Sequence, residues 1–525
     1  MTLTPNTLSK TDYQDLIYQM LKDFEGVNPY AYNDTNNNPT IGLGFEIKAN
    51  APAILKGMGY SAASFGNNSV KFNNFVSALQ AVGEGAYPDS GPDGESVKLQ
   101  AAINKIANEY LGTHYGEHNK KTGKINPNFG YGNNTGGSGL TADQQIQATF
   151  NHIEGTYETT LDSWLQGVQI PDSTERAALL SLTYNNLIGP GKSPHLHAAI
   201  ASSNRAEAWY QIRYNSNGGP AKSQPGIAKR RYDEAAIFGL YAPGAVTQAE
   251  ALQIYQMCTA HGLNNLKAYD KQHAWSLTHA QSISYANGTA QTPLPESLPS
   301  TLLPAAQELS SLYGNGQSFN ALDIFAASAN RTDVSATLTV PNSPALLLAG
   351  SGADTLVGTL TGNDVLVAGT GSDMLAGGTG VNRYDMGALA SVANVTDTIN
   401  DSGGQGSIWL GATQLGGGSG LTLNTASNGS LVWTASDGTQ YAFTPGSGAD
   451  AGIGTLSISG GALGTGDQIV IDHFDLSKAQ ASGQGYLGIH LNAALALEAG
   501  TQADSLPEVL AHVTAASPPK CSSQS

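Results

Sequence analysis

Charge is scarce in this 525-residue chain. Charged residues make up 12% of it, about half the usual share, and the net charge is −17. An acidic chain lacks the basic surface that binds nucleic acid without sequence preference, so we expect no nucleic-acid partner. Cationic residues are rarest in the rear, where only Arg331, Arg383, Lys478 and Lys520 follow residue 330. The front therefore holds nearly all the positive charge, which suits an anionic polymer.

Long apolar runs and cysteines are also scarce. No run of 18 apolar residues occurs, which predicts no transmembrane helix. Residues 1–14 are polar and lack the apolar core of a cleaved signal peptide, so we expect any export to use another route. Cys258 and Cys521 are the only cysteines, too few for a disulfide framework, and we expect both to be free thiols.

The length and the 63 glycines indicate several domains rather than one core. We expect a multidomain α+β protein with a mainly α-helical front that carries a small β-hairpin lobe, and with a β-rich rear. The expected parts are residues 1–244 as one domain with an insertion around 46–140, 245–340 as a helical connector with a Pro-rich linker, 341–388 as a β-roll, 389–495 as a β-rich domain and 496–525 as a flexible tail.

The segment from Thr11 to Gly26 has the pattern of an amphipathic helix. Its apolar residues fall on one stripe at helical spacing, and Thr11 with Gln14 resembles a capping box. Gly26 is a natural residue to end the helix. Glu25 then lies in the last turn, where the helix dipole disfavours a carboxylate and so favours the protonated form that a general acid needs.

Two short strands are expected after this helix, around 30–34 and 40–44, joined by an Asn-rich turn. A hairpin packed on the helix end would bring Asp34 and Thr40 toward Glu25. Two carboxylates on either side of a sugar chain are the basic equipment for glycoside hydrolysis. The alternative is a helix and hairpin with two unrelated surface acids, and the joint spacing argues against it.

These residues resemble the signature of the phage-type lysozymes, family 24 of the glycoside hydrolases. In that signature Glu is followed after eight residues by Asp, after five more by Thr, and then by Ile-Gly-x-Gly; here it reads Glu25, Asp34, Thr40 and 41–44. The resemblance implies that Glu25 is the general acid, that Asp34 stabilises the transition state or orients water, and that Thr40 helps to hold the nucleophilic water. The family commonly has His where this chain has Phe45, a position that we interpret as structural support.

Two later segments extend the resemblance over roughly residues 10–241. Residues 176–186 are similar to the long buried helix of the family's second lobe, and 224–234 resemble its closing basic helix. In the latter, either Arg230 or Arg231 is a candidate to face the catalytic site, and a solvated position is the alternative for each. The inserted residues 46–140 include a helix expected near 95–111.

Glycine-rich repeats with a period of nine, and one step of ten, occupy residues 349–384. They match the nonapeptide Gly-Gly-x-Gly-x-Asp-x-U-x of calcium-binding parallel β-rolls. Glycine would let the backbone turn with positive φ, the acid would supply a hard oxygen ligand, and Leu356, Leu366 and Leu375 would stack as the core. The expected calcium ligands are Asp354, Asp364, Asp373, Asn382, Gly350, Gly352, Gly362, Gly369, Gly371, Gly378 and Gly380.

The rear of the chain resembles the tails of secreted repeats-in-toxin (RTX) proteins, on the segments 382–385, 401–410 and 469–489. The resemblance implies export without a cleaved signal and folding that external calcium triggers. Calcium would then be structural, and catalysis would need no cofactor.

Together these patterns predict a secreted, antibacterial peptidoglycan hydrolase, an N-acetylmuramidase that acts outside the cell or in the periplasm of a target cell. Bacterial peptidoglycan is the expected partner, and a secretion apparatus and an immunity protein are further partners that this interpretation allows. The alternatives are a glycan-binding surface or scaffold protein whose lysozyme-like domain is inactive, and a hydrolase of chitin-like polymers. Inversion and retention of the anomeric configuration both stay open.

Overall fold

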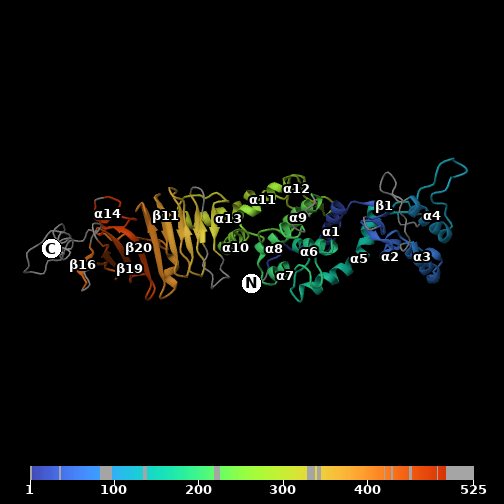
Figure 1. The fold of residues 1–525 in the computed structure, drawn as a ribbon. Helices are drawn as coiled ribbons and strands as arrows, with labels where there is room; N and C mark the ends of the chain where they lie inside the picture. Colours follow the sequence, from blue (N-terminus) through green and yellow to red (C-terminus); the bar gives the residue numbers. More distant parts are fainter. Residues whose placement is uncertain are drawn as a thin grey trace, which may run out of the picture. The chain divides into compact units, whose positions relative to one another are not determined.

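The computed structural model describes residues 3–34, 37–82, 97–133, 139–217, 225–327, 337–339, 344–418, 420–426, 430–447, 452–481 and 483–491 (Figure 1). The chain forms two compact units. Unit 1 comprises residues 1–244 and 272–296, and unit 2 comprises 245–271 and 297–525. The architecture is a multidomain α+β protein with a helical front and a β-solenoid in the rear, as the sequence predicted. The predicted tail at 496–525 lies outside the described residues.

Unit 1 is built mainly from helices. Its helices are α1 (Lys10–Glu25), α2 (Ile47–Gly57), α3 (Ser69–Val82), α4 (Val97–Leu111), α5 (Ala142–Leu165), α6 (Thr174–Tyr184), α7 (Pro194–Ala201), α8 (Arg205–Arg213), α9 (Pro225–Phe238) and α12 (Ala274–His279), with the 3₁₀ helix η1 (Ala62–Phe65). The expected insertion contributes α2, η1, α3 and α4.

Helix α1 begins and ends for identifiable reasons. Ser9 caps it by accepting a hydrogen bond from the Asp12 N–H at 3.1 Å, so the predicted capping box of Thr11 and Gln14 is wrong. The Gln14 side chain instead binds Glu154 at 2.6 Å. At the other end Gly26 has φ +72° and its N–H binds the Lys22 carbonyl, as a C-terminal glycine should.

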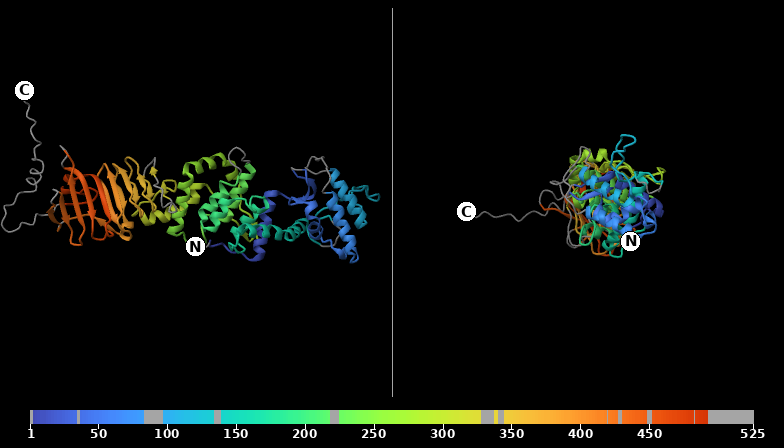
Figure 2. Two further views of the ribbon diagram at one scale, coloured as in Figure 1. Left: turned by 60° about the horizontal axis from the view of Figure 1, so that its bottom comes forward. Right: turned by 90° about the vertical axis from the view of Figure 1, so that its right-hand side faces the viewer.

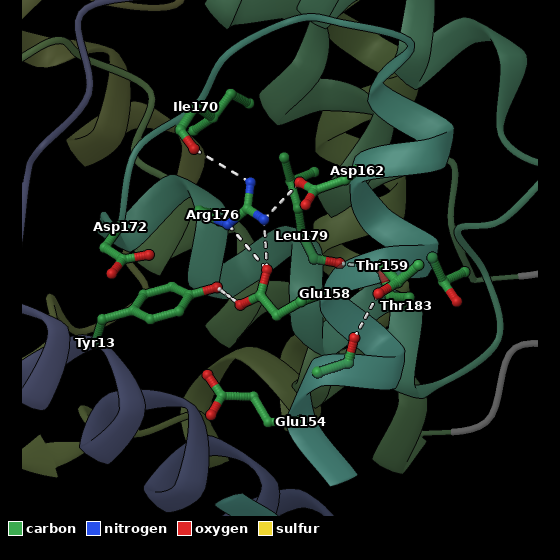
Figure 3. A network of polar contacts seen from close by, with 12 residues as sticks. Tyr13, Glu154, Glu158, Thr159, Asp162, Ile170, Asp172, Arg176, Leu179 and Thr183 are labelled. Atoms are coloured by element: carbon green, nitrogen blue, oxygen red, sulfur yellow. Dashed lines mark hydrogen bonds and ion pairs between the residues drawn. The ribbon is translucent and has the colours of Figure 1, made fainter.

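A polar network holds α1 against α5 and α6, and it is drawn in Figure 3. The Tyr13 hydroxyl donates to Glu158 Oε1 at 2.6 Å, and Arg176 Nε donates to Glu158 Oε2 at 3.0 Å. The Arg176 guanidinium also binds Asp162 at 2.6 Å and the Ile170 carbonyl at 3.2 Å. Because Arg176 is nearly buried and all its partners come from neighbouring elements, the network fixes how α1 lies in unit 1.

Three short strands follow α1 and form an antiparallel sheet in the order β1-β2-β3. They are β1 (Asn28–Asn33), β2 (Pro39–Gly42) and β3 (Phe45–Glu46). Gly42 turns the chain between β2 and β3 with φ +73°, and a Cβ there would lie 2.9 Å from the Phe45 ring. The predicted hairpin is therefore present, with β3 as an additional strand. A second pair, β4 (Ser284–Tyr285) and β5 (Ala290–Gln291), completes the unit.

Unit 2 contains α10 (Gln248–His261), α11 (Leu263–Gln272, whose last residue counts with unit 1), α13 (Leu298–Tyr313), the short helices η2 (Gly387–Ser391) and α14 (Leu476–Gln480), and a solenoid of two sheets. Five strands of the first sheet are parallel: β6 (Ile324–Ala326), β8 (Leu346–Leu348), β10 (Val365–Val367), β12 (Asn382–Asp385) and β14 (Gly406–Leu410), with β15 (Thr413–Leu415) antiparallel at the edge.

Within the described residues, the second sheet of the solenoid has nine strands. Those of the roll are parallel: β7 (Thr337–Thr339), β9 (Thr355–Val357), β11 (Met374–Gly378), β13 (Thr396–Asp401) and β20 (Gln468–Asp475). An antiparallel meander continues the same sheet through β19 (Ile453–Ser459), β18 (Gln440–Pro445), β17 (Leu431–Thr434) and β16 (Thr422–Thr425) (Figure 2). Hence no break occurs near residue 388, where we had expected a domain boundary.

Apolar side chains from both sheets fill the solenoid. Leu356, Leu366 and Leu375 have no exposed surface, which confirms the predicted core positions of the repeats. Tyr384 and Ile399 continue the same core and are equally buried. The roll and the meander thus share one hydrophobic core, which a roll this short needs for stability.

The segment predicted as a connector does not form one part. Residues 272–296 pack in unit 1, whereas α10 and α13 belong to unit 2. The expected Pro-rich linker overlaps α13, which begins at Leu298 with a proline in its first turn and carries Pro304 inside. Cys258 is a buried free thiol, and Cys521 is outside the described part of the chain. Among the described residues, no helix combines the length and the apolar character that a membrane crossing requires.

Candidate active site and repeat module

Glu25 and Arg230 form an ion pair that joins the last residue of α1 to α9. Arg230 Nη1 donates to Glu25 Oε1. The Arg230 side chain is 8% exposed and that of Glu25 is 30% exposed, so a solvated carboxylate sits on a nearly buried cation. The guanidinium carbon also lies 4.9 Å from the centre of the Phe24 ring, which limits its movement.

Arg230 is itself held by a second acid. Its Nε donates to Glu234 Oε1 at 3.1 Å, and its Nη2 donates to the Ser181 hydroxyl at 3.2 Å. The Ser181 hydroxyl donates to Glu234 Oε1 at 2.6 Å, and Glu234 has no exposed side-chain surface. Arg230 is therefore the arginine that faces Glu25. Arg231 instead binds the other carboxylate oxygen of Glu234 and the Asn185 side chain.

Asp34 follows β1 and closes the turn toward β2. Its Oδ1 accepts the Asn38 N–H at 2.7 Å, and its Oδ2 accepts the Asn38 side-chain amide at 3.1 Å. The Asp34 N–H donates to the Asn38 carbonyl at 3.0 Å. These bonds fix the orientation of a half-buried carboxylate, and they give Asp34 a structural role in the turn beside any chemical one.

Thr40 lies in β2 and is 2% exposed. Its hydroxyl donates to the Tyr32 carbonyl on β1 at 3.1 Å, across the register pair of Tyr32 with Thr40. The hydroxyl thus holds the two strands together, and its oxygen keeps its capacity to accept a hydrogen bond.

Three tyrosines surround Glu25, and the sequence pattern did not identify them. Burial raises the pKa of Tyr32, and the charges of Glu25 and Asp34 raise it further, so both carboxylates lie within electrostatic reach of one hydroxyl. Burial also raises the pKa values of Tyr157 and Tyr184, and Glu25 adds to both shifts. The rings of Tyr157 and Tyr184 are 4.8 Å apart. The acids and tyrosines thus put hydrogen-bonding groups and apolar ring faces into one environment.

Phe45 occupies the position where the family signature commonly has His. It is 1% exposed, pairs with Ile41 between β3 and β2, and packs against Gly42. Its surroundings are those of a core residue, which agrees with the interpretation of this position as support for the sheet.

Comparison with known proteins gave no match: no family model, no curated protein and no solved structure matches the chain.

Among the predicted calcium ligands, Asp354, Asp364, Asp373 and Asn382 lie at the starts of solenoid strands. Asp364 is fully buried; its Oδ1 accepts the Ala345 N–H at 2.7 Å and its Oδ2 the Thr359 N–H at 2.6 Å. Asp373 likewise accepts the N–H groups of Asp354 and Gly369 at 2.8 and 2.7 Å, and burial raises its pKa to about 6. Asn382 donates to the Gly377 and Gly380 carbonyls at 2.7 and 3.2 Å.

The oxygen groups of the predicted ligands partly suit calcium. Within the described residues neither Asp364 nor Asp373 is ion-paired to a lysine or arginine, so the buried carboxylates lack a counter-charge that a cation would supply. In the same part of the chain, no group of three or more His, Cys, Asp or Glu side chains is placed to hold a metal. A calcium ion would therefore need backbone carbonyls of the glycine loops as further ligands.

The glycines of the repeats serve a different purpose from the one predicted. Of the seven predicted glycines, Gly378 alone has positive φ, at +81°. Close stacking requires three of the others: a Cβ on Gly369 would lie 1.7 Å from the Gly350 carbonyl oxygen, one on Gly380 the same distance from that of Gly362, and one on Gly371 2.0 Å from that of Gly352. At these positions each turn of the roll sets a glycine directly on a carbonyl of the turn before.

Buried acids continue beyond the repeats, and the sequence pattern missed them. Asp397 and Asp401 have no exposed surface; Asp397 Oδ1 accepts the Asp373 N–H at 2.8 Å, and Asp401 Oδ2 accepts the Tyr384 hydroxyl at 2.7 Å. Burial raises the pKa of Asp397 to about 7. The sequence does hold a signal for Asp397. Like Asp354, it is followed by any residue and then by an apolar residue that points into the core, although the nine-residue spacing is lost there.

Proposed function

We propose that this protein is a peptidoglycan hydrolase, an N-acetylmuramidase that cleaves the β-1,4 bond between N-acetylmuramic acid and N-acetylglucosamine. The observation that carries the proposal is the spacing of Glu25, Asp34 and Thr40 in the sequence, with Glu25 at the end of α1 and with Asp34 and Thr40 in the hairpin that follows it. The contact with Arg230 orients the Glu25 side chain before a substrate binds.

In this proposal Glu25 protonates the oxygen of the bond that breaks. For that step the Glu25 carboxylate leaves the ion pair with Arg230 and takes up a proton from water, and the glycosidic oxygen becomes its hydrogen-bond partner, while Glu234 and Ser181 keep the guanidinium in position. Asp34, oriented by Asn38, stabilises positive charge on the sugar ring or orients water, and Thr40 helps to hold that water.

The test of this proposal is the chemistry of the products. Purified walls are digested with the protein, and the soluble fragments are analysed by mass spectrometry after borohydride reduction. Reduced N-acetylmuramic acid ends support the proposal. Reduced N-acetylglucosamine ends would overturn it, and so would an absence of soluble fragments, which would favour a protein that binds glycan without cutting it.

We also propose that calcium binds the repeats and stabilises unit 2, as their resemblance to RTX proteins implies. The support is the row of buried carboxylates at the strand starts, which has no counter-charge at Asp364 or Asp373. Asp354, Asp364 and Asp373 would hold the ion through carboxylate oxygens with glycine carbonyls beside them, and calcium would supply the missing positive charge. Export with calcium-triggered folding outside the cell follows from the same proposal.

A further inference from the structure

A cavity of about 650 Å³ lies in unit 2, and its lining includes neither the aspartates of the calcium repeats nor any residue of the proposed catalytic site. It opens where the start of α10 and the end of α13 approach the outer face of the first sheet. Its volume is typical of sites that bind small molecules. Its principal side chains are Gln248, Tyr313, Val367, Arg383, Asp385 and Trp409.

The strand register brings three of these side chains into a row. Val367, Asp385 and Trp409 are paired neighbours on β10, β12 and β14. Successive residues of a strand point to opposite faces, and the residues before them on these strands, Leu366 and Ile408 among them, are fully buried in the core. The row therefore faces outward into the cavity.

Hydrogen-bond donors and acceptors surround this row. The guanidinium of Arg383 lies over the Trp409 ring at 4.3 Å, and its Nη2 donates to Asp385 Oδ2 at 3.3 Å. On the helical side, Gln248 Nε2 donates to the Tyr313 hydroxyl at 2.8 Å. The Nε of Arg383 is buried and has no hydrogen-bond partner among the described residues. The cavity thus offers an unsatisfied donor, a carboxylate, an amide and a phenol next to an indole ring.

The charges select the class of ligand. One guanidinium and one carboxylate that already pair with each other leave no net charge, so the cavity does not suit a polyanion, and one carboxylate is too few for a metal ion. Planar side chains that donate and accept beside an aromatic ring suit a pyranose, whose hydroxyls take both roles and whose C–H face is apolar. We propose that this cavity binds a neutral saccharide, and that the saccharide is the N-acetylated glycan of the cell wall, a choice of source that rests on the proposed function.

The experiment measures saccharide binding to the full chain in a Glu25→Gln background, so that no sugar is cleaved during the titration. Calorimetry with the tetramer of N-acetylglucosamine gives the number of sites per chain and their affinities. Adding Trp409→Ala should remove one site per chain, or weaken it at least tenfold. Trp275→Ala is the matched control, because Trp275 is an exposed tryptophan in unit 1 outside the cavity, and it should leave every site intact.

Two further variants keep the test decisive if Trp409→Ala disturbs the sheet. Trp409→Phe retains an aromatic face and should retain the site, whereas Asp385→Asn retains the shape and should weaken it. Unchanged sites and affinities in both Trp409→Ala and Asp385→Asn would overturn the proposal. Equal binding of a glucose tetramer would overturn the choice of N-acetylated glycan. If the wild-type chain releases no wall fragments but Trp409→Ala still removes a binding site, the saccharide site stands although the proposed hydrolase activity fails. The two proposals can therefore fail separately.

Discussion

Arg230 binds Glu25 although the two residues are 205 positions apart in the sequence. The guanidinium is nearly buried and is also bound to Glu234 and Ser181, so it is the less mobile partner of the pair. The end of α1 is thus fixed to α9 through the side chain that we propose as the general acid. Arg230 thus sets the orientation of the Glu25 carboxyl group before a substrate oxygen takes its place.

Replacing Glu25 by Gln should lower the rate of wall lysis by about 10²–10⁴-fold, because an amide of the same shape cannot donate the proton. The rate is measured as the release of soluble fragments from purified walls, and thermal unfolding should show an intact fold. Asp23→Asn is the matched control on the same helix. Asp23 binds Lys229 at 3.2 Å, and its variant should keep activity within a few-fold. A Glu25→Gln protein as fast as the wild type would contradict the assignment.

Replacing Arg230 by Met should destabilise unit 1 by about 3 kcal/mol, because it breaks a buried charge network. Glu234 would keep Arg231 as its charged partner but lose Arg230, and Glu25 would lose its anchor. The melting temperature of unit 1 and the rate of wall lysis should therefore both fall. Arg230→Lys should recover part of the stability but little of the rate, since an ammonium group cannot bind both acids in a fork.

Lys229→Met is the control for this prediction. Lys229 is the neighbouring cation on α9 and is 20% exposed, and it pairs with Asp23 rather than with Glu25. Its loss should change the lysis rate little. Equal rates for the wild type and Arg230→Lys would show that the forked geometry of the guanidinium has no part in positioning Glu25.

The local structure around the proposed catalytic residues was predictable, but the contact that orients Glu25 was not. Helical periodicity predicted α1, and the Asn-rich turn predicted β1 and β2. Arg230 and Arg231 are adjacent on one helix, and either could face the site, because small differences in how α9 packs decide which one does. The predicted capping box of Thr11 and Gln14 failed for a related reason: Gln14 binds Glu154 on another helix, and Ser9, further upstream, caps α1 instead.

The repeats show the same division between local pattern and tertiary detail. The period of nine predicted that Leu356 and Leu375 lie in the core, which the structure confirms. It did not predict that the sheet runs on past residue 388 or that Asp397 extends the row of acids, because the intervals beyond the repeats are irregular. Close stacking of turns, which explains glycines such as Gly369, is visible only when neighbouring turns are placed together.

The stability of unit 1 should fall as the pH rises from about 4 to about 7, through Asp233. Burial is the largest cause that raises its pKa to about 7; the nearby acids Asp23 and Glu234 raise it further, while Lys229 and the Gln281 N–H lower it. An aspartate in the unfolded chain has a pKa of about 3.9. The folded state therefore holds the proton more tightly, and this contribution is complete below pH 4 and lost as the pH passes 7.

Asp233→Asn should remove this dependence, because an amide does not titrate. Melting temperatures of the variant and the wild type are compared between pH 4.5 and 8. As the pH rises, the melting temperature of the variant should increase relative to that of the wild type. Glu109→Gln, a change at an exposed acid on α4, should leave the wild-type profile unaltered. A constant difference between wild type and Asp233→Asn across the range would rule out titration of Asp233.

Millimolar calcium should raise the melting temperature of unit 2, and a chelator should reverse the effect. A ligand at 100 times its dissociation constant stabilises the folded state by about 2.7 kcal/mol. Asp364→Asn and Asp373→Asn should each reduce the response, because each replaces a buried acid that lacks a cationic partner. Asp437→Asn changes an exposed acid in the turn between β17 and β18 and should respond as the wild type does.

Magnesium separates calcium binding from a general effect of divalent salt. Magnesium requires near-ideal octahedral geometry and gives up its water reluctantly, so glycine loops with carbonyls and single carboxylates should favour calcium. We therefore expect millimolar magnesium to leave the transition of unit 2 nearly unchanged. If calcium also left it unchanged, calcium would have no part in the stability of unit 2, and Asp373→Asn would be expected to stabilise this unit above pH 6, where the burial-raised pKa of Asp373 places its charged form.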